Sequence, residues 1–170
     1  DGFDDVVVGA DHAHYYAEGS TPDNLIFGDR SGRAYILFGH NQGFGSSLDT
    51  DSLDGNNGFI IKGSGFFGDS LSDIGDFNSD GLDDIIVGSP SKASVIFGNA
   101  QGFNANLDIT DLDGDNGFNI NNSWSVDRAG DFNGDGLDDI AISSSKGYII
   151  FGRQGGFNTS LDISALDGTD

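Results

Sequence analysis

The sequence lacks cysteine and methionine altogether, and Glu18 is the only glutamate among its 28 acidic residues. Without cysteine, neither disulfide bonds nor zinc–thiolate sites can stabilise the fold. No run of about 18 apolar residues occurs, so we expect no membrane insertion. There is neither an initial methionine nor a recognisable signal peptide, and we therefore expect the sequence to be a processed or partial piece of a longer protein.

Positive charge is also scarce. The chain has 7 Lys+Arg against 28 Asp+Glu, which gives a formal net charge of -21. Such a surface repels nucleic acid and anionic membranes and attracts cations, so we expect no nucleic-acid partner. An acidic chain can be disordered. Here 36% of the 170 residues are hydrophobic, and they recur in phase with a repeat, which favours a folded domain.

Turn-forming residues are abundant: 28 Gly and nearly all of the acids as Asp, with many Asn and Ser. These residues favour turns and positive φ, and they are poor in helix interiors. Short apolar runs bounded by Gly and Asp, such as Ile85–Val87 and Tyr148–Phe151, are typical of strands. The sequence therefore predicts an all-β fold with almost no helix.

An acidic stretch, Asp76–Asp84, returns as Asp131–Asp139, and Asp1–Asp5 matches its second half. Each copy leads into an apolar strand, a second strand ending in Phe-Gly, a Gly-Phe element, an acidic linker and an outer strand. A last strand then leads into the next copy. The predicted strands are Val6–Ala10, Tyr35–Gly39, Phe59–Lys62, Leu71–Asp76, Ile85–Ser89, Val95–Gly98, Phe118–Asn121, Ser125–Asp131, Ile140–Ser143 and Tyr148–Gly152.

Four antiparallel strands in each repeat indicate the blades of a β-propeller. We divide the chain into residues 1–75, which carry an insertion at 11–32, residues 76–130, and an incomplete repeat at 131–170. Three blades alone would leave unpaired sheet edges, and propellers close at about 4–8 blades. We therefore expect a longer chain, or an assembly of several chains, to complete the ring.

Each acidic stretch places an oxygen-bearing side chain at positions 1, 3, 5 and 9, with glycine at position 6 (Gly81 or Gly136) to allow the sharp turn. The backbone carbonyl of position 7 can supply a further oxygen. Calcium binds about 6–8 oxygens and fits this pattern best. The predicted ligands are Asp76, Asn78, Asp80, Leu82 and Asp84; Asp131, Asn133, Asp135, Leu137 and Asp139; and, in the half copy, Asp1, Phe3 and Asp5.

Two alternatives compete with this interpretation of the acidic stretches. An EF-hand or dockerin loop needs an acid at position 12 followed by a helix, but Val87 and Ile142 stand there within apolar strands, so that class is rejected. Simple Asx-rich turns do not explain the repeated acids at positions 1, 5 and 9. For the acidic linkers around 49–57 and 108–116, in contrast, turns that cap backbone amides are favoured over a further cation site. Asp83 and Asp138, at position 8, are expected to point outward or to support the ligands.

The acidic stretches, the preceding Phe67-Gly68 and the following Val87–Pro90 resemble the FG-GAP repeat of integrin α-chain β-propellers. They look closer still to multi-repeat surface proteins of bacteria, particularly cyanobacteria. The resemblance covers essentially the whole chain. It implies a seven-bladed propeller that carries calcium in hairpin loops on one face and serves adhesion or ligand recognition.

Catalysis finds little support, because there is no Cys nucleophile, no HExxH zinc motif and no recurrent partner for the three histidines. We predict a non-enzymatic, calcium-binding module, extracellular or on the cell surface, that recognises a protein or glycan. The insertion with His12, His14, Tyr15 and Tyr16 is the candidate ligand-contacting loop, although a solvated loop is the competing interpretation. Two alternatives stay open: a calcium-dependent coat, filament or matrix component that assembles with copies of itself, and a non-catalytic propeller within a larger secreted enzyme.

Overall fold

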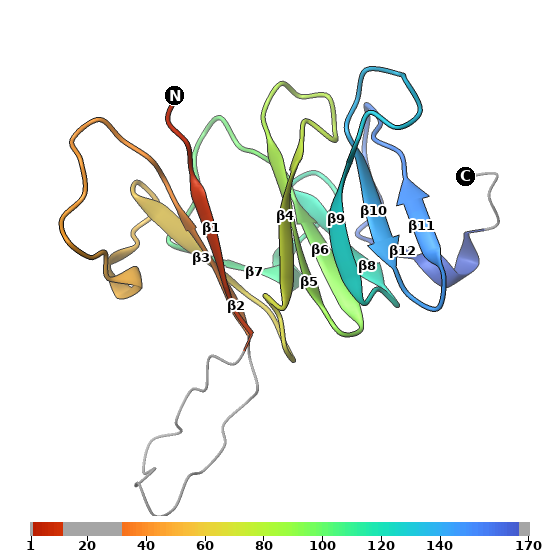
Figure 1. Ribbon diagram of the computed structural model, residues 1–170, viewed down its shortest axis with the longest axis horizontal. Coiled ribbons are helices and arrows are strands. Elements are labelled where there is room, and N and C mark those ends of the chain that lie inside the picture. Colours follow the sequence, from red (N-terminus) through yellow and green to blue (C-terminus); the bar gives the residue numbers. More distant parts are fainter. Residues whose placement is uncertain (1, 12–31, 167–170) are drawn as a thin grey trace, which may run out of the picture.

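The computed structural model describes residues 2–11 and 32–166, and shows an all-β chain in which three sheets stand side by side (Figure 1). Asp1 and the insertion residues His12, His14, Tyr15 and Tyr16 lie outside the described residues. The strands are β1 Val6–Ala10, β2 Arg33–Leu37, β3 Gly58–Lys62, β4 Ser70–Gly75, β5 Asp84–Ser89, β6 Lys92–Ile96, β7 Asn106–Asp108, β8 Gly117–Asn121, β9 Ser125–Gly130, β10 Asp139–Ser143, β11 Gly147–Ile150 and β12 Ser160–Asp162.

Strands that follow one another along the chain pair antiparallel within each sheet. We call β1-β2-β3 blade 1, β4-β5-β6-β8 blade 2 and β9-β10-β11 blade 3. Each long acidic stretch joins two strands of one blade, β4 to β5 or β9 to β10. The prediction of all-β, propeller-type blades with the acidic loops in hairpins is confirmed, whereas the division at residues 76 and 131 stays a sequence-based prediction of the repeat unit.

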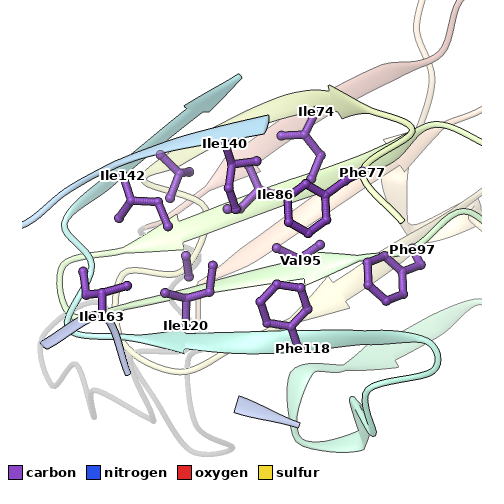
Figure 2. Close-up of a cluster of buried hydrophobic side chains, with 12 residues drawn as sticks. Ile74, Phe77, Ile86, Val95, Phe97, Phe118, Ile120, Ile140, Ile142 and Ile163 are labelled. Carbon is purple, nitrogen blue, oxygen red and sulfur yellow. The ribbon is translucent and has the colours of Figure 1, made fainter. Parts of the chain in front are cut away.

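The core lies between the blades, because successive side chains of a strand point to opposite faces of its sheet. On β5, Ile86 belongs to the cluster shared with Ile140 and Ile142 of blade 3, which Figure 2 shows. Its neighbour Val87 belongs to the other cluster, shared with Ile36 of blade 1. Blade 2 is therefore covered by apolar side chains on both faces, and its central strand β5 contains the continuous hydrophobic run Ile85–Val87.

Two short strands missing from the sequence-based prediction link neighbouring blades. β7 runs parallel to β3 of blade 1, and β12 runs parallel to β8 of blade 2. Each is preceded by the phenylalanine of a Gly-Phe element: Phe103 stacks on Phe59 at 4.1 Å between ring centroids, and Phe157 on Phe118 at 4.9 Å. Each repeat therefore reaches back to complete the outer edge of the preceding blade.

The predicted second strands of the blades were too long. β2, β6 and β11 all end before the Phe-Gly pair, because the glycine amide binds an aspartate instead of a neighbouring strand. The acidic linkers contain three single-turn 3-10 helices, Thr50–Ser52, Ile109–Asp111 and Ile163–Ala165, each capped by an aspartate side chain. No helix in the part of the chain that the structure describes is long and apolar enough to span a membrane.

Candidate functional site

The two complete acidic stretches form hairpin loops at the same end of blades 2 and 3 (Figure 1, upper edge). We call Asp76–Asp84 loop A and Asp131–Asp139 loop B. Loop A leaves β4 after Gly75 and returns into β5 at its ninth residue, Asp84. Loop B connects β9 to β10 in the same way.

In loop A, the predicted ligands organise the loop's own backbone. The two carboxylate oxygens of Asp76 accept the N–H of Asp80 at 2.9 Å and of Gly81 at 3.0 Å. The Asp80 carboxylate accepts the N–H of Leu82 at 2.9 Å, and the Asn78 side-chain oxygen accepts the N–H of Asp80 at 2.9 Å. The side chains at positions 1, 3 and 5 therefore lie on the inside of the turn.

Loop B repeats these hydrogen bonds and adds one, from the N–H of Gly134 to Asp131 at 2.7 Å. Asp131 accepts from Asp135 and Gly136, both at 2.9 Å, and Asp135 accepts from Leu137 at 2.9 Å. The position-6 glycines have φ of 88° in loop A and 91° in loop B, a left-handed conformation that a residue with a Cβ rarely adopts. The same nine-residue pattern therefore folds the same way in two different settings.

The aspartates at position 9, Asp84 and Asp139, are completely buried. One oxygen of Asp84 accepts the N–H of Phe77 at 3.1 Å and of Asn78 at 3.3 Å, while the other accepts the N–H of Gly98 at 2.8 Å. Burial raises the Asp84 pKa to about 7, since desolvation and the nearby Asp80 charge outweigh the hydrogen bonds that lower it. A cation in loop A would favour the charged form of this carboxylate.

The hydrogen bond between Gly98 and Asp84 brings the Phe-Gly pair so close to loop A that only glycine fits there. A Cβ on Gly98 would lie 2.6 Å from the Cβ of Leu82 and 2.8 Å from the carbonyl oxygen of Asp83. The same bond recurs in the other blades, from Gly152 to Asp139 at 2.9 Å and from Gly39 to Asp5 at 2.8 Å. The position-9 acid therefore binds the end of the second strand to the acidic loop in all three blades.

The aspartate at position 8 of loop B has a charged partner that the sequence analysis did not predict. In loop B, Asp138 accepts from the Arg128 guanidinium at 2.8 and 3.0 Å, and Arg128 also reaches Asp73 of blade 2 at 3.4 Å. The second carboxylate oxygen of Asp138 lies against the backbone of Gly75, where a Cβ would collide with it. This group ties loop B to the residue that precedes loop A.

The donor chemistry fits a hard cation, because each loop offers carboxylate, amide and carbonyl oxygens and no nitrogen or sulfur ligand. Within the described ranges, no three acidic or histidine side chains converge as a metal-ligand group in this conformation. The oxygens at positions 1, 3, 5 and 9 face the loop amides, so the side chains would have to reorient toward a common centre to bind an ion. In the half copy, Phe3 and Asp5 are described, and Asp1 is not.

The acidic linkers act on their own backbone. Asp54 accepts the N–H of Asn56 at 2.9 Å, and Asp113 accepts the N–H of Asp115 at 3.0 Å. Hydrogen bonds from Asn56 and Asn57 hold the Asp54 pKa below its usual value. These contacts are those of amide-capping turns, the interpretation favoured from the sequence.

Comparison with known families agrees with this architecture. Residues 68–102 and 123–159 match the FG-GAP repeat. The chain contains FG-GAP repeats. Each matched FG-GAP segment includes one complete acidic loop with the strands on either side of it, and extends past the Phe-Gly pair to the region of the following Gly-Phe element.

The curated relatives share this repeat region over a small part of their length. Phosphatidylinositol-glycan-specific phospholipase D of Mus musculus is 36% identical over 127 residues, which cover 66% of this chain and 14% of the relative. The enzyme of the same name from Homo sapiens is 34% identical over 160 residues, covering 85% of this chain and 17% of the relative. The chain thus spans less than a fifth of the length of these two relatives.

Proposed function

We propose that this FG-GAP region is a calcium-binding, extracellular β-propeller module that recognises a protein or glycan ligand. The observation that carries the calcium assignment is the correspondence of loops A and B: carboxylate oxygens at positions 1 and 5 accept the N–H groups of the same loop positions in two blades. Asp76, Asn78, Asp80, the Leu82 carbonyl and Asp84 would hold the ion in loop A. Asp131, Asn133, Asp135, the Leu137 carbonyl and Asp139 would hold it in loop B.

Electrostatics supports this role. Without a cation, each loop holds four carboxylates, three of them at the predicted ligand positions, on a chain of net charge -21, and their mutual repulsion disfavours the closed turn. With a cation, the same charges attract a common centre. Extracellular calcium modules bind at about 10⁻⁴–10⁻³ M. Free calcium at about one to ten times the dissociation constant would stabilise the fold by roughly 0.4–1.4 kcal/mol per site.

Thermal unfolding tests the stabilising role. We expect the melting temperature of the 170-residue chain to rise on addition of millimolar CaCl₂ and to return to its starting value with EDTA. Equal concentrations of MgCl₂ should raise it less, because Mg²⁺ demands a tighter octahedral site and releases its water reluctantly. The same melting temperature in CaCl₂ and in EDTA would contradict the proposal.

Recognition of a ligand is the second part of the proposal, and the related repeats of integrin-type propellers motivate it. A rigid blade scaffold presents loops at both ends of its strands, where binding residues are commonly found. Screening the chain against immobilised glycans and extracellular matrix proteins, with and without calcium, should reveal saturable binding that EDTA abolishes. Calcium-dependent self-assembly without any such ligand would favour a coat or matrix component instead.

The relatives favour a further candidate, in which this region is the non-catalytic propeller of a larger secreted enzyme. The similarity to the named phospholipases D covers 14% to 17% of their length. On this candidate, the chain by itself should release no product from a phosphatidylinositol-glycan-anchored protein. Turnover by these 170 residues alone would contradict both candidates, since both treat the propeller as non-catalytic.

A further inference from the structure

The sequence contains three Asn-Gly pairs: Asn57-Gly58, Asn116-Gly117 and Asn133-Gly134. Asparagine is a chemically labile residue, and a following glycine has no Cβ to screen its own backbone nitrogen. That nitrogen can attack the asparagine side chain and release the side-chain amide as ammonia. The attack requires the peptide group between the two residues to turn toward the side chain, so the surrounding structure decides which pair can react.

Two of the pairs are fixed where a strand begins. Gly58 is the buried first residue of β3, and the carbonyl of Asn57 accepts the N–H of Phe38 at 3.1 Å. The Asn57 side chain donates to the Ser52 carbonyl at 3.1 Å and accepts the N–H of Asp54 at 3.0 Å. The second pair, at the start of β8, has the same contacts with Phe97, Asp111 and Asp113. Turning either peptide group would break a bond that adjoins the strand pairing.

The third pair lies in the exposed turn of loop B. Asn133 and Gly134 are both exposed, and a Cβ on Gly134 would meet no atom within 4 Å. The Asn133 side chain donates to the Asp135 carboxylate at 2.8 Å and accepts the N–H of Asp135 at 2.9 Å. Because this partner belongs to the same turn, opening these bonds disturbs no strand pairing.

Loop A provides the comparison, because its nine residues differ from those of loop B at position 4 alone, where Ser79 replaces Gly134. The side chain of Ser79 screens the backbone nitrogen, and the preceding Asn78 is half-buried. In loop B, the unscreened N–H of Gly134 donates to the Asp131 carboxylate at 2.7 Å. This contact polarises the N–H bond of the nitrogen that must lose its proton before it attacks.

We propose that Asn133 is a site of spontaneous deamidation, which modifies loop B and spares loop A. The Gly134 nitrogen loses its proton to hydroxide and bonds to Cγ of Asn133, which closes a succinimide ring. The Cγ–Nδ2 bond breaks, and the nitrogen leaves as ammonia after taking a proton from water. A water molecule then opens the ring at either carbonyl, which leaves aspartate or isoaspartate at position 133. The reaction requires neither an enzyme nor a metal ion.

The modification changes both the charge and the backbone of loop B. A carboxylate at position 133 cannot donate to Asp135, so two negative groups would face each other where the amide now donates at 2.8 Å. In the isoaspartate form, an additional methylene enters the backbone and displaces the Asp135 N–H from its bond to Asp131, now 2.9 Å long. Both products therefore weaken the hydrogen bonds that close the turn of loop B.

Peptide mapping by mass spectrometry tests this inference after the intact 170-residue chain has been incubated in mildly alkaline buffer with EDTA. Asn133 should acquire the mass change of NH₂ replaced by OH at least several-fold faster than Asn57 or Asn116. Incubation in urea is the control, because unfolding frees all three pairs and they should then react at similar rates. Comparison of the folded and unfolded chains separates the effect of the structure from that of the Asn-Gly sequence.

Gly134→Ser is the matched variant, because it gives loop B the sequence of loop A, which folds in this same chain. It should slow the modification of Asn133 several-fold. Three results would each overturn the inference: Asn133 that reacts in urea and stays intact in the folded chain, equal rates at Asn57 or Asn116 in the folded chain, or an unchanged rate in Gly134→Ser. Because EDTA is present throughout, the result is independent of the calcium proposal.

Discussion

Loops A and B have nearly the same sequence and share most of their internal hydrogen bonds, yet their surroundings differ greatly. Phe77 of loop A is 0% exposed, whereas Phe132, at the same position of loop B, is 69% exposed. Phe77 is covered because Phe118 of its own blade lies beside it and Phe157 of the next repeat stacks on it. The comparison shows that the nine-residue pattern fixes the loop backbone, while the neighbouring repeat decides what its phenylalanine contributes to stability.

Replacing each of the two phenylalanines by alanine should give the largest difference in stability between loop A and loop B. Phe77→Ala should lower the free energy of unfolding by about 3–5 kcal/mol, the usual cost of removing a buried phenylalanine ring. Phe132→Ala should change it by less than about 0.5 kcal/mol, because the ring is largely solvated. Urea denaturation of the two variants measures both values. Equal losses would mean that the blades do not pack as described.

Adding a methyl group to the Phe-Gly pair should have a smaller effect. In Gly98→Ala, the new Cβ meets Leu82 and the Asp83 carbonyl, so we expect a loss of about 1–3 kcal/mol through forced shifts of loop A. Gly156→Ala is the matched control, since no atom lies within 4 Å of the place that its new Cβ would take. Chemical denaturation of both variants checks this, and a neutral Gly98→Ala would contradict the close approach of strand end and loop.

The ion pair between Arg128 and Asp138, both in blade 3, should contribute less to stability than the close approach at Gly98. Arg128 is 43% exposed and Asp138 is 22% exposed, so a double-mutant cycle of Arg128→Ala and Asp138→Asn should give a coupling of about 0.2–1 kcal/mol. The coupling should shrink in high salt, because screening acts on exposed charges. A coupling that is the same at low and high salt would argue against a charge-based link.

The smallest expected effect is on how the free energy of unfolding changes with pH. Hydrogen bonds from Thr110 hold the Asp108 pKa below its usual value, and those from Ser164 and Asn122 do the same for Asp162. A depressed pKa in the folded state gives stability that is present above the unfolded value and is lost as pH falls through the folded one. Denaturation between neutral pH and about pH 3 should therefore show a shallower loss in Asp108→Ala than in the wild type. The same loss of stability with falling pH in both proteins would contradict the role of Asp108 as the cap of the 3-10 helix Ile109–Asp111.

Much of the fold could be predicted from local pattern. Runs such as Ile85–Val87 between Asp and Gly predicted the central strands, and the repeated acids predicted both hairpin loops. The short strands β7 and β12 were missed because they are polar segments that pair, within the described part of the chain, with the preceding blade. The ends of β2, β6 and β11 were misplaced because a side chain, rather than a strand, binds the Phe-Gly amide.

In the candidate site, too, some contacts could be predicted from local sequence and others could not. The alternation of Asp76, Asn78 and Asp80 suffices to place their oxygens inside the turn, because neighbouring residues enforce it. The contact of Asp138 with Gly75 depends on how blades 2 and 3 pack, and no spacing within one repeat encodes it. The contact of Asp138 with Arg128 lies within the β9–β10 hairpin. The direct signal was the departure from the repeat at Arg128, where blade 2 has Asp73.

Isothermal titration calorimetry with CaCl₂ tests the central claim most directly. The wild-type chain should bind two calcium ions in its complete loops, and Asp80→Ala or Asp135→Ala should each remove one of them. The double variant should lose both while keeping a folded far-ultraviolet circular dichroism spectrum. Calcium binding that is unchanged in the folded double variant, or no binding to the wild type at millimolar calcium, would contradict the account.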